Sequence, residues 1–281
     1  MSNAPVIFDR KLYLARQAGA SGEAVDLLDF RVAEDLGERL AVINKHFARA
    51  LLLAPRPEAF AKVLRASGKI DDIIAHPLTD SDDLRLPSGS SFDAAFSLLD
   101  LHAVNDVPGY LAQIAAVLKP DGLAMFAFFA GETLTELRQS WLAAETNVMG
   151  GATPRIAPMI DLREAGGLLQ RAGLALPVSD LDRMTLRYSD PIALMREVKA
   201  LGFSNPLVSR SRNGISRRLL LNAVSAYQLD HSDADGRVRA TLEIAWAMAW
   251  KPHPSQQQPL KPGSASARLA DALQSPGGSQ S

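Results

Sequence analysis

The sequence lacks cysteine, and its charges nearly cancel. Without cysteine the chain can form no disulfide, no thiolate metal site and no thiol nucleophile, a composition compatible with a reducing compartment. The 30 basic and 31 acidic residues leave a net charge of -1, so no overall field draws the protein to nucleic acid or to anionic lipid. We therefore expect no nucleic-acid partner.

Long hydrophobic runs are also absent. No stretch of about 18 uncharged apolar residues occurs, and residues 1–20 contain no continuous apolar segment like that of a secretory signal. We expect a protein without a membrane span, located in the cytoplasm. What the chain does have is length and apolar content, since its 281 residues are 47% hydrophobic, which is ample for a packed core.

Strand and helix patterns alternate along most of the chain. Apolar residues at steps of three and four predict a helix over 25–43, and the nearly all-apolar run 123–130 predicts a strand buried on both faces. We expect further strands at 50–54, 69–76, 92–99, 174–179, 183–188 and 238–250, and helices near 57–68, 106–118, 133–147, 160–172, 190–201 and 215–229. The alternation predicts an α/β protein with a doubly wound, Rossmann-like sheet, whose last strand could return as an antiparallel edge strand.

The same pattern divides the chain into parts. We expect an N-terminal helical cover over 1–46 and an α/β domain over 47–250 with a helical insertion at about 190–230. The segment 251–281 is rich in Pro, Ser, Gly and Gln, so it is predicted to be a flexible tail with one candidate helix at 266–273.

Several segments resemble a known family in the same order. The stretch 90–129 reads as strand, loop, helix, Lys-Pro-Asp-Gly turn and strand, which is similar to the unit from the fourth to the fifth strand of class I S-adenosylmethionine-dependent methyltransferases. Over roughly residues 8–265 the chain resembles one branch of that superfamily. This branch holds the biotin-synthesis methyltransferase and the complex I assembly factor that hydroxylates an arginine. The segments are "FDR" (8–10), "LHAVND" (101–106), "LKPDG" (118–122), "GETLTELR" (131–138), "APMIDLREAGGLLQRAG" (157–173) and "WKPHPSQ" (250–256).

The resemblance places the cofactor loop at "APRPE", directly after the first predicted strand. The family uses glycine there, because a Cβ would block the approach of the backbone to the methionyl part of S-adenosylmethionine. Ala54 stands where the first glycine belongs, and Glu58 adds negative charge at the start of a helix. Pro55 and Pro57 each lack an N–H. Arg56 either binds the cofactor carboxylate or is a solvated turn residue, so the turn predicts that cofactor binding is weak or lost.

The stretch after this turn is short. The resemblance places the adenine contact at Asp82, in "DDLRLP", only 28 residues after Ala54. Two helices and two further strands do not fit there, since one crossover unit needs about 30 residues. We therefore predict that one strand-helix element is missing. Asp71 and Asp72 are candidates for the ribose contact by proximity only, and otherwise belong to a polar loop.

The end of the predicted strand 92–99 supplies the remaining site candidates. Leu99, its last residue, is expected to line the cofactor site. His102 lies just beyond, where α/β sheets place substrate contacts. It could carry a proton, form an aromatic wall of the pocket or be a structural histidine. The other four histidines lack the spacing of metal ligands, so no metal site is predicted.

Two functions follow from the resemblance and from its departures. The favoured one is a methyltransferase-fold pseudoenzyme with weak or no S-adenosylmethionine binding. Such a protein would assist the assembly of a protein partner, for which the resemblance suggests a subunit of respiratory complex I. The alternative is an active S-adenosylmethionine-dependent methyltransferase. An open cleft lined by the turn 54–58 and Asp82 would favour the alternative.

Overall fold

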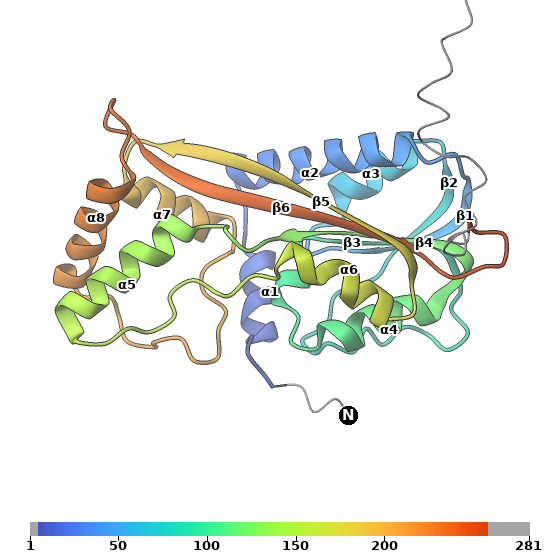
Figure 1. Ribbon diagram of the computed structural model, residues 1–281, viewed down its shortest axis with the longest axis horizontal. Coiled ribbons are helices and arrows are strands. Elements are labelled where there is room, and N and C mark those ends of the chain that lie inside the picture. Colours follow the sequence, from blue (N-terminus) through green and yellow to red (C-terminus); the bar gives the residue numbers. More distant parts are fainter. Residues whose placement is uncertain (1–4, 258–281) are drawn as a thin grey trace, which may run out of the picture.

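A six-stranded mixed sheet forms the centre of the molecule (Figure 1). The computed structural model describes residues 5–257. The strand order is β2-β1-β3-β4-β6-β5; β1 to β4 run parallel, and β6 pairs antiparallel with both β4 and β5. The strands are β1 (Phe47–Leu53), β2 (Ile70–Ala75), β3 (Phe92–Leu98), β4 (Leu118–Phe129), β5 (Ala175–Tyr188) and β6 (Val238–Trp250).

This sheet confirms the predicted α/β class and its antiparallel C-terminal strand. Residues 76–91, between β2 and β3, contain neither a helix nor a strand, as the short spacing predicted. Two details differ from expectation. The last strand, β6, lies inside the sheet and β5 forms the edge. The two short strands predicted at 174–188 are one continuous strand, β5.

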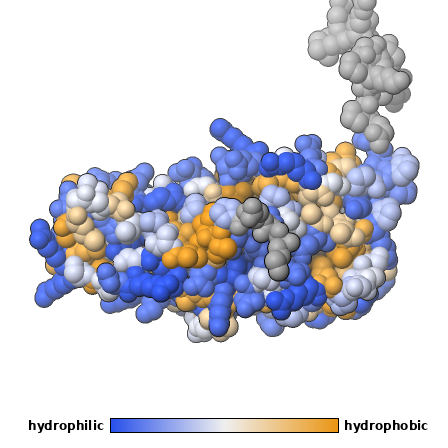
Figure 2. Space-filling model, turned by 90° about the horizontal axis from the view of Figure 1, so that it is seen from below, coloured by the Kyte–Doolittle hydropathy of each residue, from blue (hydrophilic) through white to orange (hydrophobic). Residues whose placement is uncertain are grey.

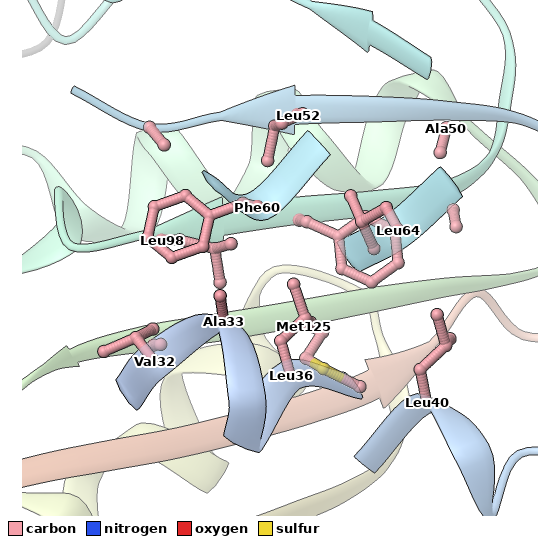
Figure 3. Packing of buried hydrophobic residues seen from close by; sticks show 14 of the residues in the cluster. Val32, Ala33, Leu36, Leu40, Ala50, Leu52, Phe60, Leu64, Leu98 and Met125 are labelled. Atoms are coloured by element: carbon pink, nitrogen blue, oxygen red, sulfur yellow. The ribbon is translucent and has the colours of Figure 1, made fainter. Parts of the chain in front are cut away.

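Helices cover both faces of the sheet (Figure 1). Two helices, α2 (Glu23–Ala41) and α3 (Glu58–Ala66), pack on one face, while α4 (Val107–Val117) and α6 (Leu162–Arg171) pack on the other. The strand period of two divides β1 between the two faces: Leu52 packs with the first layer, and Leu51 and Leu53 with the second. On the first face, α2 turns Val32, Leu36 and Leu40 toward β1 and β4, because these residues recur every turn of the helix (Figure 3).

The molecule is elongated, because β5 and β6 extend past the parallel strands (Figures 1 and 2). At that end α5 (Thr135–Met149), α7 (Pro191–Ala200) and α8 (Arg217–His231) form a separate hydrophobic cluster with β6. Figure 2 shows hydrophobic residues gathered in separate places among hydrophilic ones on the lower face. Within residues 5–257 no helix has the length and apolar content needed to cross a bilayer.

Two local features were not expected. The Lys-Pro-Asp-Gly segment lies inside β4, which begins at Leu118 and shifts register against β3. Gly122 fits this irregularity, because a Cβ there would lie 2.8 Å from the Lys119 carbonyl oxygen. A short helix, α1 (Arg10–Ala18), precedes α2. The tail beyond residue 257, with its candidate helix at 266–273, lies outside the described residues.

Candidate functional site

The direction of winding changes between β1 and β3. The helix after β1 covers one face of the sheet, and the helix after β3 covers the other. In doubly wound sheets this reversal opens a crevice at the carboxyl ends of the two strands, where ligands bind. We call this place the switch-point crevice; it is bordered by Ala54 to Arg56 after β1 and by Leu99 and Asp100 after β3.

One face of α1 fills the switch-point crevice. Its three buried residues, Arg10, Tyr13 and Gln17, are all polar, and their spacing of three and four places them on one side of the helix. Each is at most 4% exposed. The N-terminus of α1 is capped, because the side chain of Asp9 accepts a hydrogen bond from the Leu12 N–H at 3.0 Å.

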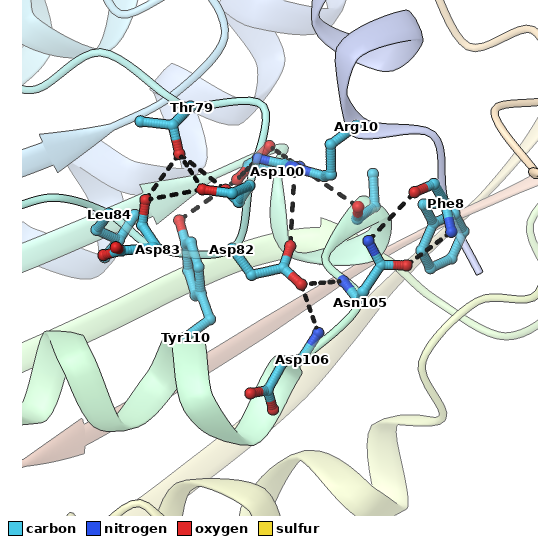
Figure 4. A network of polar contacts seen from close by, with 12 residues as sticks. Phe8, Arg10, Thr79, Asp82, Asp83, Leu84, Asp100, Asn105, Asp106 and Tyr110 are labelled. Carbon is cyan, nitrogen blue, oxygen red and sulfur yellow. Dashed lines mark hydrogen bonds and ion pairs between the residues drawn. The ribbon is translucent and has the colours of Figure 1, made fainter. Parts of the chain in front are cut away.

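Arg10 forms a buried, two-pronged ion pair with Asp100 (Figure 4). The Nη1–Oδ1 distance is 2.8 Å and the Nη2–Oδ2 distance is 3.1 Å, and the Asp100 side chain has no exposed surface. Burial alone would lower the pKa of Arg10, but the adjacent Asp100 carboxylate raises that pKa above its ordinary value. The Tyr110 hydroxyl lies 3.4 Å from Asp100 Oδ2 and can donate to it, since burial and this carboxylate raise the pKa of Tyr110. Arg10 therefore keeps its charge, and the pair is closed to solvent.

Tyr13 and Leu99 meet at the centre of the crevice. The Tyr13 hydroxyl donates a 2.7 Å hydrogen bond to the Leu99 carbonyl oxygen. Burial, followed by the Asp100 charge, raises the pKa of Tyr13, so the hydroxyl remains a donor. Leu99 is 1% exposed and has a positive φ of 57°, a strained conformation for a leucine. The residue expected to line the cofactor site is thus covered by a side chain of the same protein.

Arg56 is held by side chains of the same chain. Its Nε and Nη2 atoms donate to the two Asp29 carboxylate oxygens at 2.7 and 2.8 Å, and its Nη1 donates to Gln17 Oε1. The side chains of Arg56 and Asp29 are 16% and 10% exposed, and Ala54 is 6% exposed. The interpretation of Arg56 as a solvated turn residue is therefore wrong. The alternative, a bond to a cofactor carboxylate, would need that carboxylate to compete with Asp29 and Gln17 for the Arg56 guanidinium.

Asp82 also has protein partners (Figure 4). Its Oδ2 accepts from the backbone N–H groups of Asn105 and Asp106 at 3.1 and 2.8 Å, and its Oδ1 lies 4.0 Å from Arg10 Nε. Asn105 in turn accepts from the backbone N–H of Phe8 at 2.7 Å, which fixes the segment leading into α1. Asp82, the residue expected to contact adenine, thus holds the loop before α4 next to the segment that leads into α1.

The two candidate ribose residues lie away from the crevice. Asp71 and Asp72 are in the first half of β2, with side chains more than half exposed, and they face His46 and Arg49. At the carboxyl end of β2, where the resemblance implies an acidic residue, the chain has His76, whose Nε2 lies 2.7 Å from the Leu84 carbonyl oxygen. Asp71 and Asp72 are therefore strand residues, in agreement with the strand predicted at 69–76, and the alternative of a polar loop is wrong for them.

His102 lies beside a cavity and not in the switch-point crevice. A short 3-10 turn, Leu101–Ala103, carries it, and its ring packs against Phe129 and Phe203 with centroids 4.8 and 5.7 Å away. It is 6% exposed, and neither ring nitrogen has a hydrogen-bond partner among the described residues. Burial and the positive charge of Arg10 lower the pKa of His102 to about 3, so the ring is neutral at ordinary pH.

The cavity has a volume of about 610 Å³. It lies between α2, α7, the end of β5 and the beginning of β6, with Tyr13 and His102 on the side next to the crevice. Ala54, Arg56 and Asp82 do not line it. Within residues 5–257 no group of three acidic or histidine side chains could hold a metal ion.

Sequence reasoning missed the residues that close the crevice. Arg10 lies in the quoted segment "FDR", and Asp100 directly precedes "LHAVND", so both were adjacent to family-like segments. Asp29 and Gln17 carry no such signal, because only the fold brings them to Arg56. Gly202, which follows α7, packs against α1. Its φ of +77° and its lack of a Cβ allow close approach to the Arg16 carbonyl.

The strand order, with its switch-point crevice, defines the class I methyltransferase architecture, and comparisons with known proteins agree. The profile of the "Methyltransferase domain" family matches residues 37–126. Arginine-hydroxylase NDUFAF5, mitochondrial, from Danio rerio is 34% identical over 242 residues, covering 86% of this chain and 75% of the relative. The same protein from Homo sapiens is 33% identical and covers 94% and 83%. Malonyl-[acyl-carrier protein] O-methyltransferase from Laribacter hongkongensis is 37% identical and covers 88% and 90%.

The chain therefore belongs to the class I S-adenosylmethionine-dependent methyltransferase superfamily, in the branch that includes NDUFAF5 and the malonyl-[acyl-carrier protein] O-methyltransferases.

Proposed function

We propose that this protein uses a methyltransferase fold without S-adenosylmethionine and acts by binding a partner protein during its assembly. The partner class that the branch suggests is a subunit of respiratory complex I. The observation that supports this proposal most strongly is the polar face of α1, whose three side chains fill the switch-point crevice.

The first obstacle to the cofactor is its carboxylate. A carboxylate at Arg56 would compete with Asp29 and Gln17 for the guanidinium, and an Asp29 that lost this partner would be a mostly buried charge without a counter-ion. Breaking a buried ion pair in this way costs about 3–5 kcal/mol. Pro55 and Pro57 offer no backbone N–H in compensation, and Glu58 at the start of α3 repels an anion.

The second obstacle is the nucleoside. The end of β2 has His76 in place of an acidic residue that could bind two ribose hydroxyls, and Asp82 is engaged by backbone N–H groups. The Tyr13 hydroxyl occupies the Leu99 carbonyl with a hydrogen bond. A nucleoside would have to displace α1 and break its buried hydrogen bonds.

Thermal unfolding with S-adenosylmethionine and S-adenosylhomocysteine tests the loss of the cofactor. A ligand at a hundred times its Kd stabilises a protein by about 2.7 kcal/mol, which for a chain of this size raises Tm by roughly 5–10 °C. We expect no shift at physiological cofactor concentrations. A saturable shift would overturn the proposal and favour the alternative, an active S-adenosylmethionine-dependent enzyme.

The assembly role is tested separately in cells that lack this chain. We expect less assembled complex I on native gels, restored by expression of the wild-type chain. An unchanged amount of assembled complex I would contradict the assembly role and would leave the cofactor result intact.

A further inference from the structure

The 610 Å³ cavity beside His102 has the dimensions of a small-molecule site. Cavities of about 300–1,000 Å³ that are mainly apolar, with a few polar groups, are typical of sites that bind small organic ligands. This cavity lies outside the side chains that close the switch-point crevice, apart from Tyr13, which borders both.

Its wall is mainly apolar because strand alternation turns one face of β5 toward it. Met184, Leu186 and Tyr188 occupy every second position of that strand and line the cavity, together with Leu242 of β6. These side chains are only partly buried, although Leu186 and Leu242 lie on strands of a packed sheet. Their remaining exposed surface faces a space that the chain itself does not fill.

The ionic groups at the cavity are mostly engaged within the protein. Arg155 contacts the buried Glu145 at 2.6 Å, Arg31 contacts Asp182 at 3.2 Å, and Glu197 accepts a 2.7 Å hydrogen bond from Tyr188. The carboxylate that remains, on Glu23, lies on an exposed residue at the start of α2. No cation among the described lining residues is left to neutralise an anionic ligand.

His102 is the polar group that lacks a partner at this cavity. It is 6% exposed, borders the cavity, and has two ring nitrogens without a hydrogen bond within the described residues. A buried polar atom without a partner is unfavourable, and native proteins rarely leave one unsatisfied. Neither nitrogen is accessible from the cavity as the ring lies, so a ligand hydroxyl or carbonyl satisfies one only if the ring turns toward the cavity, where a neutral imidazole can donate or accept.

We propose that this cavity binds an uncharged, chain-like amphiphile whose hydroxyl or carbonyl head hydrogen-bonds His102 while its hydrocarbon chain lies against β5 and β6. The proposal goes beyond the function proposed above, because it does not depend on whether the switch-point crevice binds S-adenosylmethionine.

The first test uses the neutral fluorescent probe N-phenyl-1-naphthylamine and its displacement by 1-decanol. We expect saturable, one-to-one binding of the probe and full displacement by the alcohol. Leu186→Trp, which places a larger ring in the cavity, should weaken probe binding at least tenfold. Leu181→Trp is the matched control on the outer face of the same strand, where the side chain is 38% exposed, and it should bind as the wild type does.

The second test addresses the head group. Decanoate and decylamine should displace the probe at least tenfold less well than 1-decanol, because their charges would be buried without a partner. His102→Phe keeps the ring and removes its nitrogens, so 1-decanol should bind about five- to tenfold more weakly, as expected for one hydrogen bond.

Three results would overturn the proposal: probe fluorescence that never saturates, equal binding by the two tryptophan variants, or tighter binding of a charged decyl ligand than of 1-decanol. Probe binding that only a peptide of a partner protein displaces would also contradict it and assign the cavity to that partner. Thermal unfolding of each variant checks that its fold is intact.

Discussion

The switch-point crevice and the cavity beside it differ in what the chain does with polar groups. In the crevice, Arg10, Arg56 and Tyr13 each find a partner within the protein. At the cavity, His102 has none among the described residues, although it is equally buried. In the crevice, which the family uses for its cofactor, the buried atoms Arg10 Nε and Asp82 Oδ1 lack a hydrogen bond but face each other as opposite charges 4.0 Å apart, while the neighbouring cavity retains space and an uncharged ring without a partner. This contrast supports both proposals, the loss of cofactor binding in the first region and the binding of a ligand in the second.

Loss of the Arg10–Asp100 ion pair in the crevice should reduce the stability of the protein more than any other change. Arg10→Met leaves Asp100 buried without its partner, so we predict a loss of about 3–5 kcal/mol in the free energy of unfolding, measured with urea. Arg187→Met is the matched control. Its ion pairs with Asp233 and Asp235 are on the surface, where solvent screens them, so stability should stay almost unchanged. Equal losses in the two variants would contradict the closed crevice.

The fold was largely predictable from the sequence because apolar runs mark buried strands. The segments that became β1, β3, β4 and β6 each contain a mainly apolar run, and glycine or proline marks several turns between them. The position of β6 inside the sheet was not predictable, since periodicity reports which face of a strand is buried and not which strand lies beside it.

The closure of the site was not predictable in the same way. Hydrophobic periodicity cannot detect α1, because the buried face of this helix is made of Arg10, Tyr13 and Gln17. The turn at Ala54 did predict an altered cofactor loop, but the partners of Arg56 come from 27 and 39 residues away. Only folding brings those side chains together.

Acidification should destabilise the protein through His102, the buried histidine beside the cavity. The folded-state pKa of His102 is lowered from 6.5 to about 3, so the unfolded chain takes up a proton first as the pH falls below about 6.5. Stability is therefore lost on acidification between these two values, by about 2 kcal/mol from pH 7 to pH 5 for this group. Urea unfolding of His102→Phe at both pH values should show a loss smaller by that amount. An unchanged pH dependence would mean that His102 titrates normally.

Removing a tyrosine hydroxyl from each region should give smaller losses of stability that can be compared directly. Tyr13→Phe leaves the buried Leu99 carbonyl without a donor and should cost about 1–2 kcal/mol. Tyr188→Phe removes the bond to Glu197 beside the open cavity, where water can replace it, and should cost about 0.5 kcal/mol or less. Thermal unfolding measures both, and the reverse order would contradict the difference between crevice and cavity.

Restoring glycine in the turn after β1 should have the smallest effect on cofactor binding. Ala54→Gly combined with Arg56→Gly restores glycine at the cofactor loop, yet we predict no binding of S-adenosylmethionine by calorimetry. The reason is that His76 occupies the end of β2 and Asp82 remains held by Asn105. Saturable binding by this variant would show that the nucleoside part of the crevice is intact.

The most direct test of the account is calorimetric titration of the wild-type protein with S-adenosylhomocysteine. Asp29 of α2 and Gln17 of α1 already satisfy Arg56, and Tyr13 of α1 covers the Leu99 carbonyl, so we predict no saturable heat at physiological cofactor concentrations. A saturable one-to-one isotherm in that range would contradict the claim that the protein's own side chains have replaced the cofactor.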